Sequence, residues 1–466
     1  MLGRTRRVHF VGIGGIGMSG IAELLANLGY EISGSDAKGS EVTARLQQRF
    51  KVRVSEGHAA ANVGDADVVV VSSAIRRTNP EIAEAERRGI PVIPRAEMLA
   101  ELMRLHFAIA VAGSHGKTTT TSMIALVLER AGLDPTAVIG GRLSVFGSNA
   151  RLGDSEYMVA EADESDRSFL MLWPSIAVVT NIDREHMESY GSLDALQQAF
   201  ADFANKVPFY GSVVACADDP NLAAVLPRVK RRVMTYGFDR NATVFADGVE
   251  VGSFGGRCSV HMQAGAETTR LGLLELSVPG RHNLQNALAA VAVGERLGLT
   301  FEQVAGALRD FAGAERRFER HGEPGGVVVI DDYGHHPTEI AAVLAAARAT
   351  LNCRLIVAFQ PHRYSRTAQL LDEFGPAMKD ADEIVLTDIY AAGEEPAPGI
   401  TVDVLAESIR RGSGRTVVVV PSIDDVIPRL LQIARPGDAV ITLGAGSIGA
   451  LPRKLVDALE QRKAGR

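Results

Sequence analysis

The chain has 466 residues, of which 46% are hydrophobic and 23% charged, and this length predicts about three domains, each with its own core. Its net charge of −7 excludes a general basic surface for nucleic acid or an anionic membrane, and no apolar run is long enough to span a membrane. Three cysteines lie far apart, which argues against a disulfide framework or a zinc site and suits a reducing cytoplasm.

Residues 8 to about 105 alternate short apolar runs with helical stretches, a rhythm that predicts a parallel sheet. The turn after the first predicted strand, at 12–17, reads Gly-Ile-Gly-Gly-Ile-Gly and fits a pattern that places a pyrophosphate on a helix N-terminus. Asp36 follows the second predicted strand, where an acidic residue would meet a ribose-like diol. A nicotinamide cofactor satisfies this pattern, and so do other nucleoside diphosphates.

A second glycine-bearing turn, Gly-Ser-His-Gly-Lys-Thr at 113–118, follows a predicted strand at 109–112 and precedes a helix predicted at 118–131. Backbone N–H groups and a helix N-terminus at one spot favour an anion. Lys117 supplies a positive charge for terminal phosphates, and the Thr118 hydroxyl can hold Mg²⁺. The general pattern has glycine where this chain has Val111, so an ordinary strand–turn–helix junction is the alternative.

Polar residues follow the next two predicted strands, at 157–160 and 176–180. Glu161 adjoins the first strand end and is the best candidate for a Mg²⁺ ligand. For the other acidic residues of this turn we expect simple solvation; they are Asp163, Glu164 and Asp166. His186 follows the second strand, so it should lie at the same sheet edge as the phosphate loop.

The stretch at 279–287 is predicted to open a helix that runs to about residue 297, after β-structure at 231–236 and 243–251. His282, Asn283 and Asn286 could cap this helix or present polar groups to a base. From 313 onward, strands are predicted at 327–330, 355–359, 383–387, 417–420 and 439–443.

Two polar clusters follow strands of this third region. His335 and His336 come after the first strand, and Arg363 and Arg366 after the second. Open α/β sheets bind ligands at the carboxyl ends of their strands, which favours a site over a plain helix start at Pro337. The segment at 394–399 is expected to be an exposed loop.

Taken together, these motifs resemble the Mur ligase family, the ATP-dependent amide-bond formers of peptidoglycan synthesis. The resemblance covers essentially the whole chain, and the family uses the shorter phosphate loop found here. It rests on GSHGKTTT at 113–120, EADESD at 161–166, NIDREHM at 181–187, HNLQNA at 282–287 and DDYGHHPTE at 331–339.

The resemblance implies an α/β fold of three domains. A Rossmann-like domain at 1–105 would bind a UDP-sugar, and a central P-loop ATPase-like domain at 106–312 would bind ATP. A C-terminal Rossmann-like domain at 313–466 would close over ATP and bind the amino acid.

The family chemistry begins when a carboxylate attacks the ATP γ-phosphate and forms an acyl phosphate. An amine then attacks the acyl carbon, and phosphate leaves. The implied substrates are ATP, UDP-N-acetylmuramate and L-alanine, with two Mg²⁺ ions and no nucleic acid or membrane partner. Some members carry a carbamylated lysine after the metal histidine. Here that stretch has Gln198 and Ala201, and the nearest lysine is Lys206, so no carbamate is expected.

Residue roles follow from the same resemblance. Lys117, Glu161 and His186 would be catalytic, and Thr118, Glu161 and His186 would hold metal. The expected ATP-binding residues are Gly113, Ser114, His115, Gly116, Lys117, Thr118, Thr119, His282, Asn286, Arg317 and Asp332. The expected UDP-sugar residues are Gly14, Gly15, Ile16, Gly17, Asp36, Ser72 and Ser73. The expected amino-acid residues are Tyr333, His335, Arg363 and Arg366.

Three alternatives stay open at this point. A ligase of the same family that recycles a murein tripeptide tends to differ at Tyr333-Gly334. A nicotinamide-dependent oxidoreductase would leave the Gly-Lys-Thr turn unexplained. A nucleotide-gated switch protein would leave Arg363, Arg366 and His335 without a role.

Overall fold

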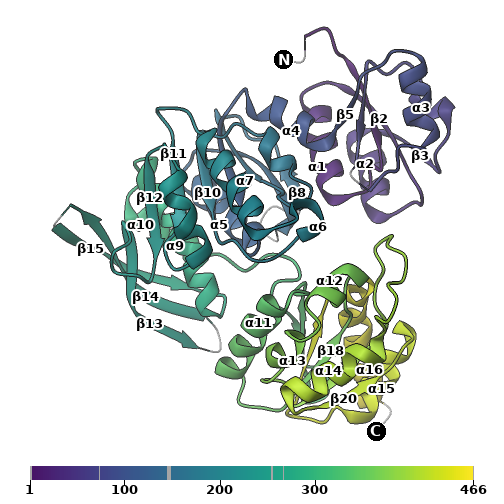
Figure 1. Cartoon of the computed structure of the whole chain (residues 1–466), viewed down its shortest axis with the longest axis vertical. Helices are drawn as coiled ribbons and strands as arrows, with labels where there is room; N and C mark the ends of the chain where they lie inside the picture. Colours follow the sequence, from purple (N-terminus) through teal and green to yellow (C-terminus); the bar gives the residue numbers. More distant parts are fainter. Residues whose placement is uncertain (1–2, 73, 144–147, 253–254, 266, 465–466) are drawn as a thin grey trace. The chain divides into compact units, whose positions relative to one another are not determined.

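The computed structural model describes residues 3–72, 74–143, 148–252, 255–265 and 267–464. The chain forms two compact units, one of residues 1–248, 258–275 and 285–312 and one of residues 249–257, 276–284 and 313–466. Three sheets with their helices follow one another along the chain, and Figure 1 colours them from purple through teal to yellow. This arrangement confirms the predicted three-domain α/β fold.

The first sheet is entirely parallel, with strand order β3-β2-β1-β4-β5. Its central strand buries Val8, Phe10 and Val11 completely, as expected for a strand with both faces covered. The order reverses between β1 and β4, so the turn after β1 lies where such sheets bind ligands. The elements are β1 (Arg7–Val11), α1 (Ile16–Asn27), β2 (Glu31–Asp36), α2 (Glu41–Phe50), β3 (Arg53–Glu56), η1 (Ala60–Val63), β4 (Val68–Val71), α3 (Pro80–Arg87), β5 (Val92–Pro94) and α4 (Arg95–Met103).

The second sheet has the order β15-β14-β13-β12-β11-β10-β6-β9-β7-β8. In this order, the six strands β12, β11, β10, β6, β9 and β7 are parallel to one another. The edge strand β8 pairs antiparallel with β7. Strand β6 lies between β9 and β10, so the phosphate loop that follows β6 is flanked by the ends of both neighbours.

The strands of this sheet are β6 (Phe107–Ala112), β7 (Thr136–Leu143), β8 (Ser148–Arg151), β9 (Tyr157–Glu161), β10 (Ile176–Val179), β11 (Ser212–Cys216), β12 (Val233–Gly237), β13 (Val244–Gly252), β14 (Gly255–Ala264) and β15 (Glu267–Leu276). The helices along the same stretch are α5 (Lys117–Arg130), η2 (Ser168–Met171), α6 (Met187–Tyr190), α7 (Leu193–Asn205), α8 (Pro220–Val225), η3 (Leu226–Arg228), α9 (Arg281–Arg296) and α10 (Phe301–Arg309). The whole of α5 from Thr119 to Leu128 is buried, which fits a helix packed on the sheet.

The third sheet has the order β16-β17-β21-β18-β19-β20, parallel except for β16. Strands β17 and β18 both pair with β21, so the residues after each meet at one edge. The strands are β16 (Glu319–Gly322), β17 (Val328–Asp332), β18 (Leu355–Phe359), β19 (Glu383–Leu386), β20 (Thr416–Val419) and β21 (Ala439–Leu443).

Helices cover this sheet in Figure 1, in green to yellow. They are η4 (Pro324–Gly326), α11 (Pro337–Thr350), α12 (Tyr364–Gln369), α13 (Phe374–Ala377), α14 (Val402–Ser413), η5 (Ile423–Asp425), α15 (Val426–Ile433), η6 (Ser447–Ala450) and α16 (Leu451–Ala464). Across the described residues, every helix is too short or too polar to cross a membrane.

Candidate active site

The phosphate loop adopts a backbone that its glycines make possible. Gly113 and Gly116 have φ angles of 137° and 81°, and α5 begins directly afterwards at Lys117. A Cβ atom on Gly116 would lie 2.8 Å from the Asn286 amide oxygen. Asn286 therefore packs against the loop.

Lys117 is the centre of this loop. Its ammonium donates to the Gly113 and Ser114 carbonyl oxygens at 2.6 and 3.2 Å and to Glu164 Oε1 at 2.8 Å. Burial disfavours the charged ammonium, but the carboxylates of Glu164 and Asp163 outweigh it and raise the pKa of Lys117. The lysine is thus held as a cation against the carbonyl groups of the phosphate loop.

The prediction of a solvated acidic turn is wrong for Glu164, which is only 1% exposed. Lys117, 47 positions away in sequence, supplies the charge that makes this burial tolerable. The carboxylates of Asp163 and Asp166 accept hydrogen bonds from the Ser165 and Ser168 backbone N–H groups of the turn, and Asp163 also pairs with Arg95 at 3.3 Å. Burial raises the pKa of the Glu164 carboxyl.

The predicted metal ligands come from three strand ends, as expected. Glu161 ends β9 in register with Val111 of β6, and Thr118 lies in the first turn of α5. His186 comes after β10, with φ at 57° and its ring Nε2 3.8 Å from Glu164 Oε1. Mg²⁺ prefers oxygen donors, which the Glu161 carboxylate and the Thr118 hydroxyl offer, and His186 would add an imidazole nitrogen.

Residues after β10 fasten the phosphate loop, although the sequence motifs gave them no role. Asn181 Oδ1 accepts from the His115 backbone N–H at 2.8 Å, and Asp183 Oδ2 lies 2.9 Å from His115 Nε2. Ser114 Oγ accepts from the Asp183 backbone N–H at 2.7 Å. Thr119 is buried on the first turn of α5. Asn181 and Asp183 follow β10, and the phosphate loop follows the neighbouring strand β6. This position after adjacent strands is the sequence signal that could have predicted their contact with the loop.

His282, Asp332 and Arg317 form a polar group in the second unit. Burial, with a smaller effect of Arg317, lowers the pKa of His282 to about 4, so its ring is neutral at pH 7. Burial raises the pKa of Asp332 to about 6 against the attraction of Arg317. Asp332 accepts from the Gly334 and Phe318 backbone N–H groups at 2.7 Å each. Arg317 also lies 3.5 Å from Glu339 and over the Tyr333 ring.

The expected amino-acid residues gather at the edge shared by β17 and β18. The His335 ring stacks edge-on against Tyr333 at 5.5 Å and against His362 at 5.4 Å, and Arg366 Nη1 lies 3.3 Å from His362 Nδ1. Burial and neighbouring cations lower the pKa of His362 to about 3. Arg363 has a φ of 70°, a strained conformation for a non-glycine residue.

Three further polar residues have structural roles. His336 caps α11 by accepting from the Thr338 backbone N–H at 3.3 Å, so the helix-start interpretation is right for His336. Glu394 lies in the segment predicted as a plain exposed loop. The segment is indeed an irregular, largely exposed loop, and the Glu394 carboxylate also accepts from the Ser365 backbone N–H and hydroxyl at 3.0 and 2.6 Å, at the start of α12. The Asn283 side-chain amide donates a hydrogen bond to the Pro279 carbonyl oxygen at 2.6 Å.

The glycine turn after β1 contacts the carboxylate of Asp36, the last residue of β2. The Gly14 backbone N–H donates to Asp36 Oδ2 at 2.8 Å. Gly15 and Ile16 open α1, and Ser72 follows β4, next to β1. Ser73 lies outside the described residues. Arg95, which no motif singled out, lies against Gly17 and pairs with Asp163 at 3.3 Å.

A buried polar network around Glu81 lies next to the strand end that contacts the glycine turn. Glu81 is fully buried, and its carboxylate accepts from Ser35 Oγ at 2.7 Å and Asn62 Nδ2 at 2.8 Å and pairs with His9 Nε2 at 3.0 Å. Burial alone would raise the pKa of Glu81, but these donors lower it to about 2. Because Ser35 precedes Asp36, the network fixes the strand end that carries Asp36.

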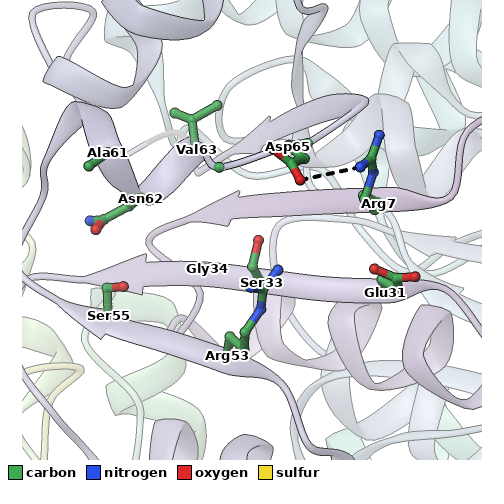
Figure 2. A pocket seen from close by; sticks show the side chains of 12 residues that line it. Arg7, Glu31, Ser33, Gly34, Arg53, Ser55, Ala61, Asn62, Val63 and Asp65 are labelled. Carbon is green, nitrogen blue, oxygen red and sulfur yellow. Dashed lines mark ion pairs between the residues drawn. The ribbon is translucent and has the colours of Figure 1, made fainter.

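A separate cavity of about 230 Å³ opens on the same sheet (Figure 2). Its lining includes Arg7, Glu31 and Arg53, the first residues of β1, β2 and β3. The Arg7–Asp65 ion pair, 3.5 Å long, borders it. The glycine turn follows the opposite, carboxyl end of β1, so this cavity is distinct from the expected UDP-sugar site.

Three family models match the chain. They are the Mur ligase family, catalytic domain, at residues 7–107, the Mur ligase middle domain at 111–294, and the Mur ligase, glutamate ligase domain at 316–446. A UDP-N-acetylmuramate–L-alanine ligase of Anaeromyxobacter sp. is 54% identical over 457 residues, 98% of each chain.

Solved structures extend the similarity to the fold. The UDP-N-acetylmuramate-alanine ligase of Thermotoga maritima is 29% identical, with a TM-score of 0.83 and coverage of 99% of this chain and 100% of that one. A murein peptide ligase of Psychrobacter arcticus is 28% identical, with a TM-score of 0.73 and coverage of 98% and 99%.

Proposed function

The chain belongs to the Mur ligase family, and from this premise we propose that it uses ATP to join L-alanine to the carboxylate of UDP-N-acetylmuramate in peptidoglycan synthesis. The observation that carries the proposal is Lys117, a cation held in a glycine turn at a strand end. The full-length similarity to L-alanine ligases supports the choice of substrates.

In the first step, a carboxylate oxygen of the sugar attacks the γ-phosphorus, the bond to the bridging oxygen breaks, and ADP leaves. Negative charge accumulates on the transferring phosphoryl group, and Lys117 is placed to neutralise it. Two bound Mg²⁺ ions would supply further charge neutralisation, with Thr118 and Glu161 holding one ion and His186 the other.

In the second step, the amine of L-alanine attacks the acyl carbon, loses a proton, and phosphate leaves. The alanine carboxylate needs a planar pair of donors, which Arg363 and Arg366 offer, while His335 and Tyr333 border the small side chain. The adenosine and phosphates of ATP would be bound by His282, Asn286, Arg317 and Asp332.

The UDP part is assigned to the first domain. The turn from Gly14 to Gly17 would take the diphosphate, Asp36 the ribose diol, and Ser72 and Ser73 neighbouring polar groups. The proposed domain limits are 1–105, 106–312 and 313–466. We place the reaction in the cytoplasm, where ATP is available.

The test is phosphate release from ATP and Mg²⁺ with UDP-N-acetylmuramate, across a panel of amino acids and the tripeptide L-alanyl-γ-D-glutamyl-diaminopimelate. We expect release that requires both the sugar and L-alanine. Release driven by the tripeptide and not by alanine would instead identify a recycling ligase. Failure to release phosphate with any acceptor would contradict the proposed function.

A further inference from the structure

We infer that Glu164 and Glu185 are ligands of the metal ion assigned to His186, and that Lys117 and this ion compete for the Glu164 carboxylate. The inference rests on the proposed function only for the presence of Mg²⁺. It gives Glu164, which the sequence analysis expected to be simply solvated, a role in metal binding.

The three side chains lie near enough to one another to converge on one ion. One oxygen of each glutamate and one ring nitrogen of His186 lie within 4.8 Å of one another. An octahedral ion with ligands at about 2.1 Å separates adjacent ligands by about 3.0 Å and opposite ligands by about 4.2 Å. The distance from His186 Nε2 to Glu164 Oε1 is 3.8 Å, within that range, although Oε1 is the oxygen that also pairs with Lys117.

Burial separates this cluster from an ordinary acidic surface. Glu164 and Glu185 are 1% and 7% exposed. Glu164 Oε2 is buried and lacks a hydrogen-bond partner among the described residues. A carboxylate oxygen in that condition is costly to the fold. A cation beside it would supply the missing partner.

Lys117 already satisfies the other oxygen of the same carboxylate. Its ammonium lies 2.8 Å from Glu164 Oε1 and also holds two loop carbonyl groups. Two positive charges near one carboxylate repel each other, so each weakens the binding of the other, and this coupling is reciprocal. When phosphates draw Lys117 toward them, Glu164 becomes a stronger ligand for the ion.

The experiment measures Mn²⁺ binding to the full chain by the loss of the free Mn²⁺ EPR signal, without nucleotide, sugar or alanine. Glu164→Gln should weaken binding by about tenfold or more, and Glu185→Gln should weaken it similarly. Lys117→Met should strengthen binding by about fivefold or more, because it removes the competing charge. The matched control is Asp166→Asn, in the same turn, which should bind as wild type does.

Two outcomes would overturn the inference. One is wild-type affinity in both glutamine variants, with near-native circular dichroism. The other is unchanged or weaker binding in Lys117→Met, which would mean that the lysine and the ion do not share Glu164. Because the assay contains no ligase substrate, its failure is distinguishable from failure of the proposed reaction.

Discussion

The two glycine turns of this molecule share a backbone plan and differ in charge. After β1, a loop N–H donates to the carboxylate of Asp36 at 2.8 Å. After β6, the ammonium of Lys117 rests on loop carbonyl groups at 2.6 and 3.2 Å. Both turns end in a helix N-terminus that favours an anion, so the side chains around each turn select the ligand. A carboxylate suits the sugar diol beside a diphosphate, whereas a lysine suits terminal phosphates.

Removing the charge of the second turn should have the largest effect. Lys117→Ala should lower kcat by roughly a hundredfold or more, because it deletes one placed charge at the transition state. Steady-state phosphate release measures this. Lys206→Ala removes a lysine that stacks on Trp173 in the same unit and serves as the control. Near-normal turnover of Lys117→Ala would rule out the assignment.

The residues expected to bind the amino acid belong to neither glycine turn, so substitutions there should change the KM for alanine alone. Arg366→Ala or Arg363→Ala should raise the KM for alanine by roughly tenfold to a hundredfold, the loss of one charged hydrogen bond. The KM values for ATP and the UDP-sugar should change little, and lysine should rescue poorly.

Partial reactions sharpen this test. The arginine variants should still form the acyl phosphate when alanine is omitted, and Arg411→Ala, an exposed arginine of the same unit, is the control. A variant that keeps its alanine KM but cannot form the acyl phosphate would place these arginines at the phosphate end of the site.

Crowding the first turn should have a smaller effect, confined to the UDP-sugar. A Cβ on Gly14 would lie 2.8 Å from Asp36 Oδ2, so Gly14→Val should raise the KM for the sugar by roughly tenfold and leave the KM for ATP unchanged. Gly17→Val should act similarly but less strongly, because its nearest neighbour is the flexible end of Arg95. Gly306→Ala, in open space on α10, is the control. An equal rise in both KM values would contradict the separation of the two turns.

The smallest effect is expected on stability. Glu81→Gln should lower the free energy of unfolding by about 1–3 kcal/mol at pH 7, because it weakens a buried network of charged hydrogen bonds. The folded-state pKa of about 2 is below the ordinary value of 4.5. The carboxylate therefore contributes stability above about pH 4.5 and loses it as the pH falls through about 2. Calorimetry should show the difference from wild type shrinking over that range. A difference that is constant with pH would contradict the ionised network.

The sequence predicted those elements that carry strong hydrophobic runs or glycine turns. Strands such as Leu355–Phe359 and Ala439–Leu443 match the structure residue for residue. Strands β3 and β5 were missed because Arg-Val-Ser-Glu and Val-Ile-Pro are short and only half-buried. The edge strands β8 and β16 were missed for the same reason, since they are four residues long.

Pairings between distant residues were beyond single-sequence reasoning. Glu164 looked solvated because its partner Lys117 comes from another strand end. The buried Glu81 gave no signal either, since its partners His9, Ser35 and Asn62 are spread over three segments. Strand-end position did place Glu161, His186 and the phosphate loop at one edge, because that rule depends on topology and not on side-chain geometry.

Calorimetric titration of NADH and UDP-N-acetylmuramate into wild type and Gly14→Val tests the contrast between the two turns most directly. The wild type should bind the UDP-sugar and not NADH. Gly14→Val should lose most of its affinity for the sugar while it binds ATP as wild type does. Tight NADH binding by the wild type, abolished in Gly14→Val, would show that the first turn belongs to a nicotinamide cofactor and would contradict the account.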